Sequence, residues 1–277
     1  MTNVVPIMPA YWHKHLRVKD HHSMKVSRWM LKKIDYLRRK LKQGLRDFVM
    51  GPYYVLEGQC FLVPKSAPVG ARRGLSQCRY EAPERRLLRK FLPTDMPVIE
   101  LGGSYGIVSN VIRRHISPDQ LHVIIEANAD LLPICAHNVF LAGSFETVEF
   151  MNVAIGYSCD GYLQFEVSNS HHGNKISTSK IEDVPTRMVK AMSLSDLTKK
   201  YVCKSEYSLV CDIEGAELEM LRRDGGALKK CKCLILETHP SVFSEMGSSV
   251  EEVMDLIAAA GLKIVARDQD VLVALRD

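Results

Sequence analysis

An acid followed by a glycine-rich turn offers the clearest place for a cofactor. Residues 98–106 read Val-Ile-Glu-Leu-Gly-Gly-Ser-Tyr-Gly, with Glu100 just before the glycines. Glycine allows a tight turn with positive φ and lets a ligand come closer than a Cβ would permit. A carboxylate here suits a ligand with hydroxyl and ammonium groups, whereas it would repel a phosphate. The spacing also differs from the dinucleotide fingerprint and the P-loop, so we favour S-adenosylmethionine over a nucleotide.

A second acid, Glu126, ends the next apolar segment, and Ala127 and Asn128 lead from it into a helical pattern. A carboxylate at this point can accept hydrogen bonds from both ribose hydroxyls of an adenosine, as in NAD-binding folds. Glu126 therefore indicates an adenosine but fits S-adenosylmethionine and NAD equally well. Glu100 is the residue that favours S-adenosylmethionine over NAD. The structural alternative is that Glu126 caps the helix that opens near Asn128.

Two later apolar segments end in groups that can transfer protons. Asp212 and Glu214 end one of them, and Glu237 and His239 end the other. Ligands of open α/β sheets bind outside the carboxyl ends of the strands, so these groups should meet beside the glycine turn. Residues two apart in a strand share a side, so each pair should point the same way. Glu217, a little further on, could cap its helix or take part in the chemistry.

From residue 97 onward, short apolar segments alternate with helical patterns. Strands are expected at 97–101, 121–126, 147–153, 207–213, 233–238, 262–266 and 270–275, and helices at 106–116, 128–142, 193–201, 214–223 and 249–260. Such alternation predicts a mainly parallel sheet with helices on both faces. The gap before the last strand is too short for a crossover, so that strand must run antiparallel. The predicted class is α/β, with a seven-stranded, mainly parallel sheet and an antiparallel last strand.

A basic helical pattern occupies residues 23–48, where apolar side chains recur every three or four positions. This stripe could pack on the rest of the protein or on a second subunit, as in a homodimer, or lie on anionic lipid. Nucleic-acid binding is not expected, because aromatic residues are not interleaved with the basic ones. We expect a basic amphipathic helical arm over 1–50, a connecting segment with loops and a small hairpin over 51–79, and the main domain over 80–277.

The composition allows one sizeable core, since 46% of the 277 residues are hydrophobic. No apolar run approaches the roughly 18 residues that cross a bilayer. Residues 1–10 lack the pattern of a secretory signal, and the eight cysteines form no Cys-x-x-Cys pair. We therefore expect a cytoplasmic protein, which the arm could bring to the periphery of a membrane. The polar segment 168–187 breaks the alternation and is expected to be a substrate-facing lid or a disordered insertion.

The motifs resemble those of the FkbM-type methyltransferases, a class I family with a Rossmann-like fold that depends on S-adenosylmethionine. The resemblance covers about residues 80–239, and its specific part is Asp-x-Glu-Gly-Ala-Glu at 212–217 followed by Glu-x-His at 237–239. The family usually has Asp where Glu100 stands and Pro where Ala127 stands, and neither change removes a required group. The resemblance implies transfer of a methyl group to a hydroxyl, often of a sugar or a polyketide.

The resemblance also implies roles for individual residues. Cofactor contacts would come from Glu100, Gly102, Gly103, Ser104, Gly106, Glu126, Ala127, Asn128, Val153, Ala154 and Asp212. Glu100 would serve the methionine end, Glu126 the ribose, and the turn with Val153 and Ala154 the adenine. The catalytic group would be His239, Asp212, Glu237 and Glu214.

Methyl transfer requires alignment of the acceptor oxygen, methyl carbon and sulfur, and removal of the hydroxyl proton. His239 is the expected base by its ordinary pKa, with Asp212 and Glu237 orienting it or holding the acceptor. No metal is predicted. In the alternative, Asp212, Glu214, Glu237 and His239 bind a divalent ion that acidifies the hydroxyl.

The leading interpretation is an O-methyltransferase for a sugar, glycan or glycolipid-like acceptor. The arm would suit an acceptor anchored at a membrane surface. One alternative is an NAD-dependent sugar epimerase or reductase, which Glu100 and the reversed last strand disfavour. Another is a non-catalytic adaptor with the same fold that binds lipid or a partner through its arm.

Overall fold

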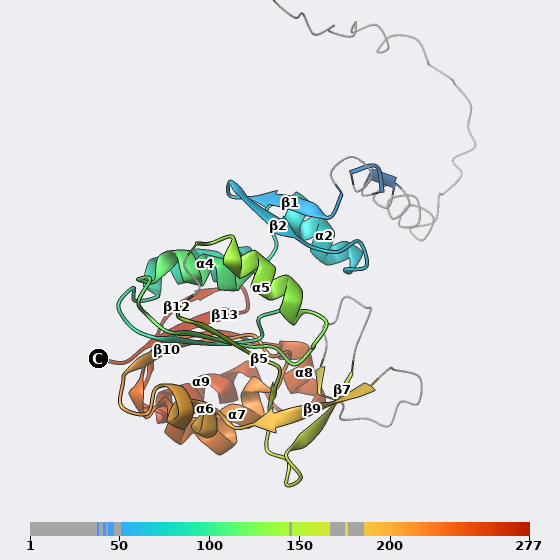
Figure 1. Ribbon diagram of the computed structural model, residues 1–277. Helices are drawn as coiled ribbons and strands as arrows, with labels where there is room; N and C mark the ends of the chain where they lie inside the picture. The colour runs from blue at the N-terminus through green and yellow to red at the C-terminus, as the bar shows by residue number, and fades with distance from the viewer. Residues whose placement is uncertain are drawn as a thin grey trace, which may run out of the picture. The chain divides into compact units, whose positions relative to one another are not determined.

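The computed structural model describes residues 38, 41–42, 44–46, 51–143, 146–166, 175–176 and 186–277 (Figure 1). The chain divides into two units, Met1–Lys42 and Gln43–Asp277. The described residues of the first unit, Arg38, Leu41 and Lys42, are helical and exposed. The other residues of the expected arm before Lys42 lie outside the described residues. None of the described helices is long and apolar enough to cross a membrane.

The connecting segment folds as part of the second unit. Strands β1 (Tyr53–Leu56) and β2 (Gln59–Leu62) form the expected hairpin. Helix α2 (Val69–Ser76) follows the hairpin. Loops were expected here, because the two glycines of this segment weaken its helical pattern. Buried side chains of the hairpin and α2 share one apolar cluster with Tyr105 and Ile107. This packing brings the connecting segment against the glycine turn.

The main sheet confirms the expected seven strands. They are β3 (Val98–Leu101), β4 (His122–Ile125), β5 (Val148–Met151), β10 (Tyr207–Cys211), β11 (Cys231–Glu237), β12 (Lys263–Asp268) and β13 (Val271–Leu275). Their order is β12-β13-β11-β10-β3-β4-β5. The strands run parallel apart from β13, which is antiparallel to both of its neighbours. The chain leaves β3 toward one edge and later returns to place β10 on its other side, which creates the switch point where α/β folds bind ligands.

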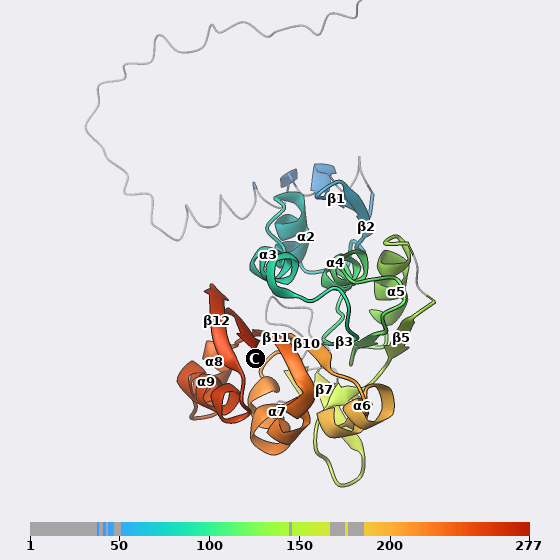
Figure 2. The same cartoon turned by 90° about the vertical axis from the view of Figure 1, so that its left-hand side faces the viewer.

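Helices cover both faces of the sheet, as Figures 1 and 2 show. One face carries α3 (Ala82–Phe91), α4 (Ile107–His115) and α5 (Leu132–Phe140). The other carries α6 (Leu194–Tyr201), α7 (Glu217–Asp224), the short 3-10 helix η1 (Gly225–Lys230), α8 (Pro240–Glu245) and α9 (Val250–Ala259). Each face has its own apolar cluster, so the central strands are buried on both sides, which explains their continuous apolar sequences.

The alternation along the central strands decides where their acids point. The apolar residues that face α3 and α4 include Val98, Val210 and Ile235. Residues two apart share a side, so Glu100, Asp212 and Glu237 turn toward α3 and α4 as well. The strand tips are thus acidic on the face that α3 covers.

A second, smaller sheet follows β5. It has the order β6-β9-β7-β8, formed by β6 (Ala154–Ile155), β7 (Tyr162–Glu166), β8 (Lys175–Ile176) and β9 (Thr186–Met192). Strand β7 matches an apolar segment of the sequence, whereas β9 is half-polar and was not expected. Of the predicted lid over 168–187, only 175–176 and 186–187 are described, and both pieces are strand. The remainder of that prediction lies outside the described residues.

Candidate active site

The glycine turn sits where β10 approaches β3. Gly102 has a φ of +95°, and a Cβ on it would lie 1.8 Å from the carbonyl oxygen of Asp212. Gly106 also has positive φ, and a Cβ there would meet the backbone of Cys135 at 2.7 Å. A Cβ on Gly103 would lie 2.6 Å from the side chain of Ile124. The turn therefore needs its glycines for close packing between the sheet and α5.

A cavity of about 770 Å³ opens beside this turn, at the carboxyl ends of the central strands. Its size lies within the range of about 300–1,000 Å³ that is usual for small-molecule sites. Among the residues predicted to bind a cofactor, those that line it are Gly102, Ser104, Glu126, Ala127, Asn128, Val153, Ala154 and Asp212. Gly103 and Gly106 are not among the lining residues; both pack closely against neighbouring segments, and their contact with a cofactor stays a prediction.

Glu126 is held at the edge of this cavity by the backbone. Its two oxygens accept hydrogen bonds from the N–H groups of Ser104 and Asn128, each at 2.7 Å. Burial raises the pKa of Glu126, although these backbone hydrogen bonds favour the carboxylate. The helix that follows begins only at Leu132, with Leu131 as its N-cap. The capping alternative for Glu126 is therefore wrong, and backbone hydrogen bonds hold its carboxylate at the cavity.

Glu100 differs from the prediction. Its side chain is 1% exposed, and its two oxygens contact the Ser109 hydroxyl and His122 Nε2, each at 2.8 Å. Strand alternation turns it under α4, and it is not among the residues lining the cavity. The carboxylate of Glu100 is thus used within the core, and the expected contact with the methionine end of the cofactor, through water or the backbone, stays a prediction.

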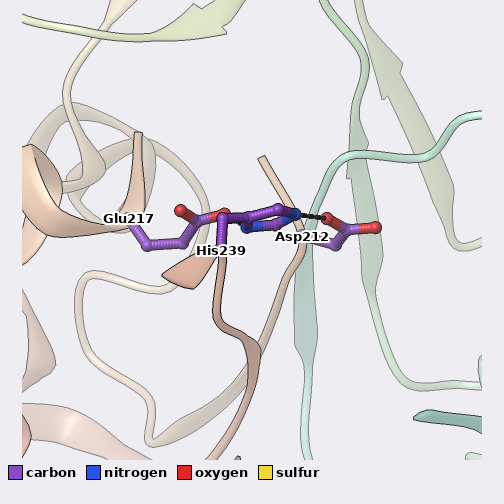
Figure 3. Close-up of side chains that lie close together, drawn as sticks. All are labelled: Asp212, Glu217 and His239. Carbon is purple, nitrogen blue, oxygen red and sulfur yellow. Dashed lines mark ion pairs between the residues drawn. The ribbon is translucent and has the colours of Figure 1, made fainter. Parts of the chain in front are cut away.

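His239 lies between two carboxylates, as Figure 3 shows. Its Nδ1 is 3.2 Å from Glu217 Oε1, and its Nε2 is 3.4 Å from Asp212 Oδ1. Glu214 Oε2 lies 3.5 Å from the same Nε2. Glu217 is fully buried, and its Oε1 also accepts a hydrogen bond from the Ile213 N–H at 2.8 Å. Glu217 thus contacts both His239 and the backbone that leads into α7, so both of its expected roles stay open.

The acids determine the ionisation of this cluster. Burial by itself lowers the pKa of His239, but Glu217, Asp212 and Glu214 together raise it to about 10. Burial raises the pKa of Asp212 to about 7, and burial with the charge of Asp212 raises that of Glu237 to about 7. The surrounding acids thus favour the protonated form of His239, which cannot accept another proton. The role of His239 as the base stays a prediction.

Two acids that the sequence did not single out as site residues complete the surroundings. Glu81 has a φ of +49° and lines the cavity. Glu84, in the first turn of α3, is 3% exposed and offers an oxygen within 4.8 Å of oxygens of Asp212 and Glu237. Burial raises the pKa of both glutamates well above the ordinary value. Both belong to the segment over which the sequence resembles the family, but that resemblance gave them no role in the site.

The predicted alternative metal set does not assemble as one group. The described His, Cys, Asp and Glu residues that come close enough to share an ion form two sets, Asp212–Glu217–His239 and Glu84–Asp212–Glu237. Glu237 belongs to the second set, while His239 belongs to the first. Asp212 is common to both.

Comparison with known proteins agrees with this geometry. Residues 100–264, more than half of the chain, match the family described as the methyltransferase FkbM domain. No curated protein matches the chain. This family membership overturns the alternative of an NAD-dependent epimerase or reductase.

Solved structures with a similar fold include several methyltransferases. The chain is 11% identical to M. capricolum TrmK in complex with S-adenosyl-homocysteine, over 70% of this chain and 68% of that one, with a TM-score of 0.39. It is 14% identical to a putative O-methyltransferase from Klebsiella pneumoniae, over 69% and 77%, with a TM-score of 0.41. It is 12% identical to a putative methyltransferase from Thermoplasma acidophilum, over 81% of each chain, with a TM-score of 0.40. These likenesses are too distant to argue for an acceptor. On its family match, this chain belongs to the FkbM methyltransferases, enzymes that take their methyl group from S-adenosylmethionine.

Proposed function

We propose that this protein is an O-methyltransferase whose acceptor is a hydroxyl of a sugar or glycan. The observation that carries the proposal is the set of carboxylates that line one side of the cavity: Glu81, Asp212, Glu214 and Glu237. Carboxylates accept hydrogen bonds and do not donate them when ionised, so they suit an acceptor rich in hydroxyl groups. They would repel phosphates, which disfavours a nucleic acid.

The residues at the cavity fit S-adenosylmethionine. Glu126, with both oxygens aimed by backbone N–H groups, would accept the ribose hydroxyls, and Val153 and Ala154 would flank the adenine. Since Glu100 is used within the core, Glu81 is the carboxylate that we assign to the ammonium of the methionine end. When bound, the cofactor supplies an electrophilic methyl group on a sulfonium sulfur.

The proton of the acceptor hydroxyl must leave to a group that faces the cavity. We assign this role to Asp212, whose pKa of about 7 suits a general base at neutral pH. Asp212 lines the cavity, and its Oδ1 lies 3.4 Å from His239 Nε2. Glu217 would hold His239 in place, and the protonated His239 would in turn position the carboxylate of Asp212. The cavity wall would exclude water and align the acceptor oxygen.

The acceptor chemistry is tested by incubating the protein with methyl-labelled S-adenosylmethionine and three acceptor panels: neutral glycosides and glycans, amines, and RNA. We expect labelled methyl ethers on the neutral polyols, identified by mass spectrometry. Methylation of nitrogen, or of RNA alone, would refute the proposal. Asp212→Asn should then lower turnover by about 100-fold or more, while binding of S-adenosyl-homocysteine remains measurable by calorimetry. If His239→Gln abolishes turnover and Asp212→Asn does not, the assignment of the base is wrong.

The predicted arm leads to a separate part of the proposal. The basic stripe over 23–48 would bring the enzyme to an acceptor at an anionic membrane surface, and this idea depends on the sequence alone. The full chain and a variant lacking Met1–Lys42 are compared in co-sedimentation with vesicles of anionic and of neutral lipid. We expect only the full chain to sediment with the anionic vesicles. Equal sedimentation of both chains would contradict this role, and a dimer lost with the deletion would favour the subunit interface instead.

A further inference from the structure

Three carboxylates from separate elements face one another below the cavity. Glu84 comes from α3, Asp212 follows β10, and Glu237 ends β11. One oxygen of each lies within 4.8 Å of the others. Their meeting follows from the fold, because strand alternation turns Asp212 and Glu237 toward the face that α3 covers.

Glu84 is the unexpected member of this set. It is 3% exposed, and no hydrogen bond or ion pair involves its side chain within the described part of the chain. The charges that act on it come from other acids: Glu81, Asp212, Glu237 and Glu100. A buried carboxylate without a partner costs several kcal/mol, roughly, unless it is protonated or meets a cation.

The basic groups near this set contact other acids. Arg85, the next residue of α3, pairs with Glu57 on the hairpin. His122 pairs with Glu100, and His239 lies between Glu217 and Asp212. The charge of His239 also acts on Glu237, whereas the described charges that act on Glu84 are all acids.

We propose that Glu84, Asp212 and Glu237 bind a divalent cation of the Mg²⁺ or Mn²⁺ kind. Oxygen ligands lie about 2.0–2.6 Å from such hard ions, so ligands on opposite sides can lie up to about 5 Å apart. The set meets this requirement without moving the backbone. Carboxylates with water or substrate oxygens in the remaining positions are the ligands that Mg²⁺ and Mn²⁺ prefer.

The ion would act on the proposed acceptor, so this inference deepens the proposed function and rests on it. Asp212 and Glu237 line the cavity, and an ion between them would face it too. A hydroxyl bound to the ion loses its proton more readily. The proton would leave to one of the cavity carboxylates, such as Glu81 or Glu214, that the ion does not use.

The second set, Asp212–Glu217–His239, is the competing location. There, both ring nitrogens of His239 face carboxylates, and Glu217 Oε1 is already used by the Ile213 N–H. An ion at that place would first have to displace the proton of His239. The set of Glu84, Asp212 and Glu237 offers three carboxylates, the ligands that hard ions prefer, and we therefore prefer it.

The test is Mn²⁺ binding to the full chain after removal of metals, followed by electron paramagnetic resonance of the free ion. We expect one saturable site in the wild type, and at least a tenfold weaker affinity in Glu84→Gln. Glu149→Gln, which changes an exposed glutamate on β5, is the matched control and should bind as the wild type does. Absence of a saturable site in the wild type, or unchanged affinity in Glu84→Gln, would overturn the proposal. Loss in Glu217→Gln alone would place the ion in the competing set and also overturn it.

Two further measurements keep the result unambiguous. Glu84→Gln keeps the size of a side chain whose described charged neighbours are acids, so its metal-free melting temperature should equal or exceed that of the wild type. A lower value would make Glu84→Ala the variant to compare. Mn²⁺ should raise the melting temperature of the wild type and not that of Glu84→Gln. Saturating S-adenosyl-homocysteine should leave Mn²⁺ bound; if it displaces the ion, the carboxylates belong to the cofactor and the proposal fails. None of these readouts uses an acceptor, so failure of the proposed acceptor would be seen separately.

Discussion

Replacing Gly102 by alanine should destabilise the protein more than the same change at a glycine with open surroundings. At Gly102 the φ is +95°, and an added Cβ would lie 1.8 Å from the carbonyl oxygen of Asp212 and 2.9 Å from its carbonyl carbon. At Gly161 the φ is +75°, and an added Cβ would meet no described atom within 4 Å. The two variants thus separate backbone strain from the close approach of β10 to the turn.

The magnitudes follow from these two contributions. A left-handed backbone costs an alanine about 1–2 kcal/mol in either variant. At position 102 the methyl group must also push backbone atoms away, and overpacking of this kind costs about 1–3 kcal/mol more. We therefore expect a loss of about 2–5 kcal/mol for Gly102→Ala and of about 1–2 kcal/mol for Gly161→Ala. The first loss is a large share of a typical stability of about 5–15 kcal/mol.

Urea unfolding followed by circular dichroism measures both losses, provided that the dependence on urea is unchanged. Calorimetric titration with S-adenosyl-homocysteine gives a second readout. Because the displaced residue, Asp212, lines the cavity, Gly102→Ala should also weaken this binding, whereas Gly161→Ala should not. Equal loss of stability in the two variants would show that β10 moves away freely, and our account of the turn would be refuted.

Three further predictions concern acids outside the proposed ion site. Glu126→Gln should weaken binding of S-adenosyl-homocysteine by about 10- to 100-fold in calorimetry, since hydrogen bonds to a charged group contribute about 1.5–3 kcal/mol; unchanged affinity would remove Glu126 from the ribose site. Glu100→Gln should leave that affinity within about twofold but lower the free energy of unfolding by about 1–3 kcal/mol, because Ser109 and His122 lose a carboxylate as hydrogen-bond partner; weaker binding with unchanged stability would instead support a contact between Glu100 and the cofactor. Burial alone would raise the pKa of Glu57, but its ion pairs with Arg89 and Arg85 lower it below the ordinary 4.5. The stabilisation from Glu57 should therefore be complete above pH 4.5 and lost as the pH falls through the lower, folded-state pKa. Wild type and Glu57→Gln should differ by about 1 kcal/mol at pH 7 and converge in acid unfolding, and a constant difference would contradict the sign.

The fold could be predicted in most of its elements because its signals are local. Apolar runs of strand length, separated by helical periodicity, specify a parallel sheet, and the short gap before Val271 requires the reversed last strand. The elements that were missed carry weak local signals. Helix α2 contains two glycines, and β9 alternates polar with apolar side chains outside the main sheet.

The sequence by itself placed carboxylates at the strand ends and so determined that a polar cavity would form at one edge of the sheet. Only the tertiary structure decided which of them face that cavity. Glu100 and Glu126 have similar positions in the sequence, yet packing under α4 turns one into the core while two backbone N–H groups aim the other at a ligand. The partners of His239 and the place of Glu84 depend on distances between segments far apart in the chain. Ionisation and ion binding follow from those distances, because charges act through space and not along the sequence.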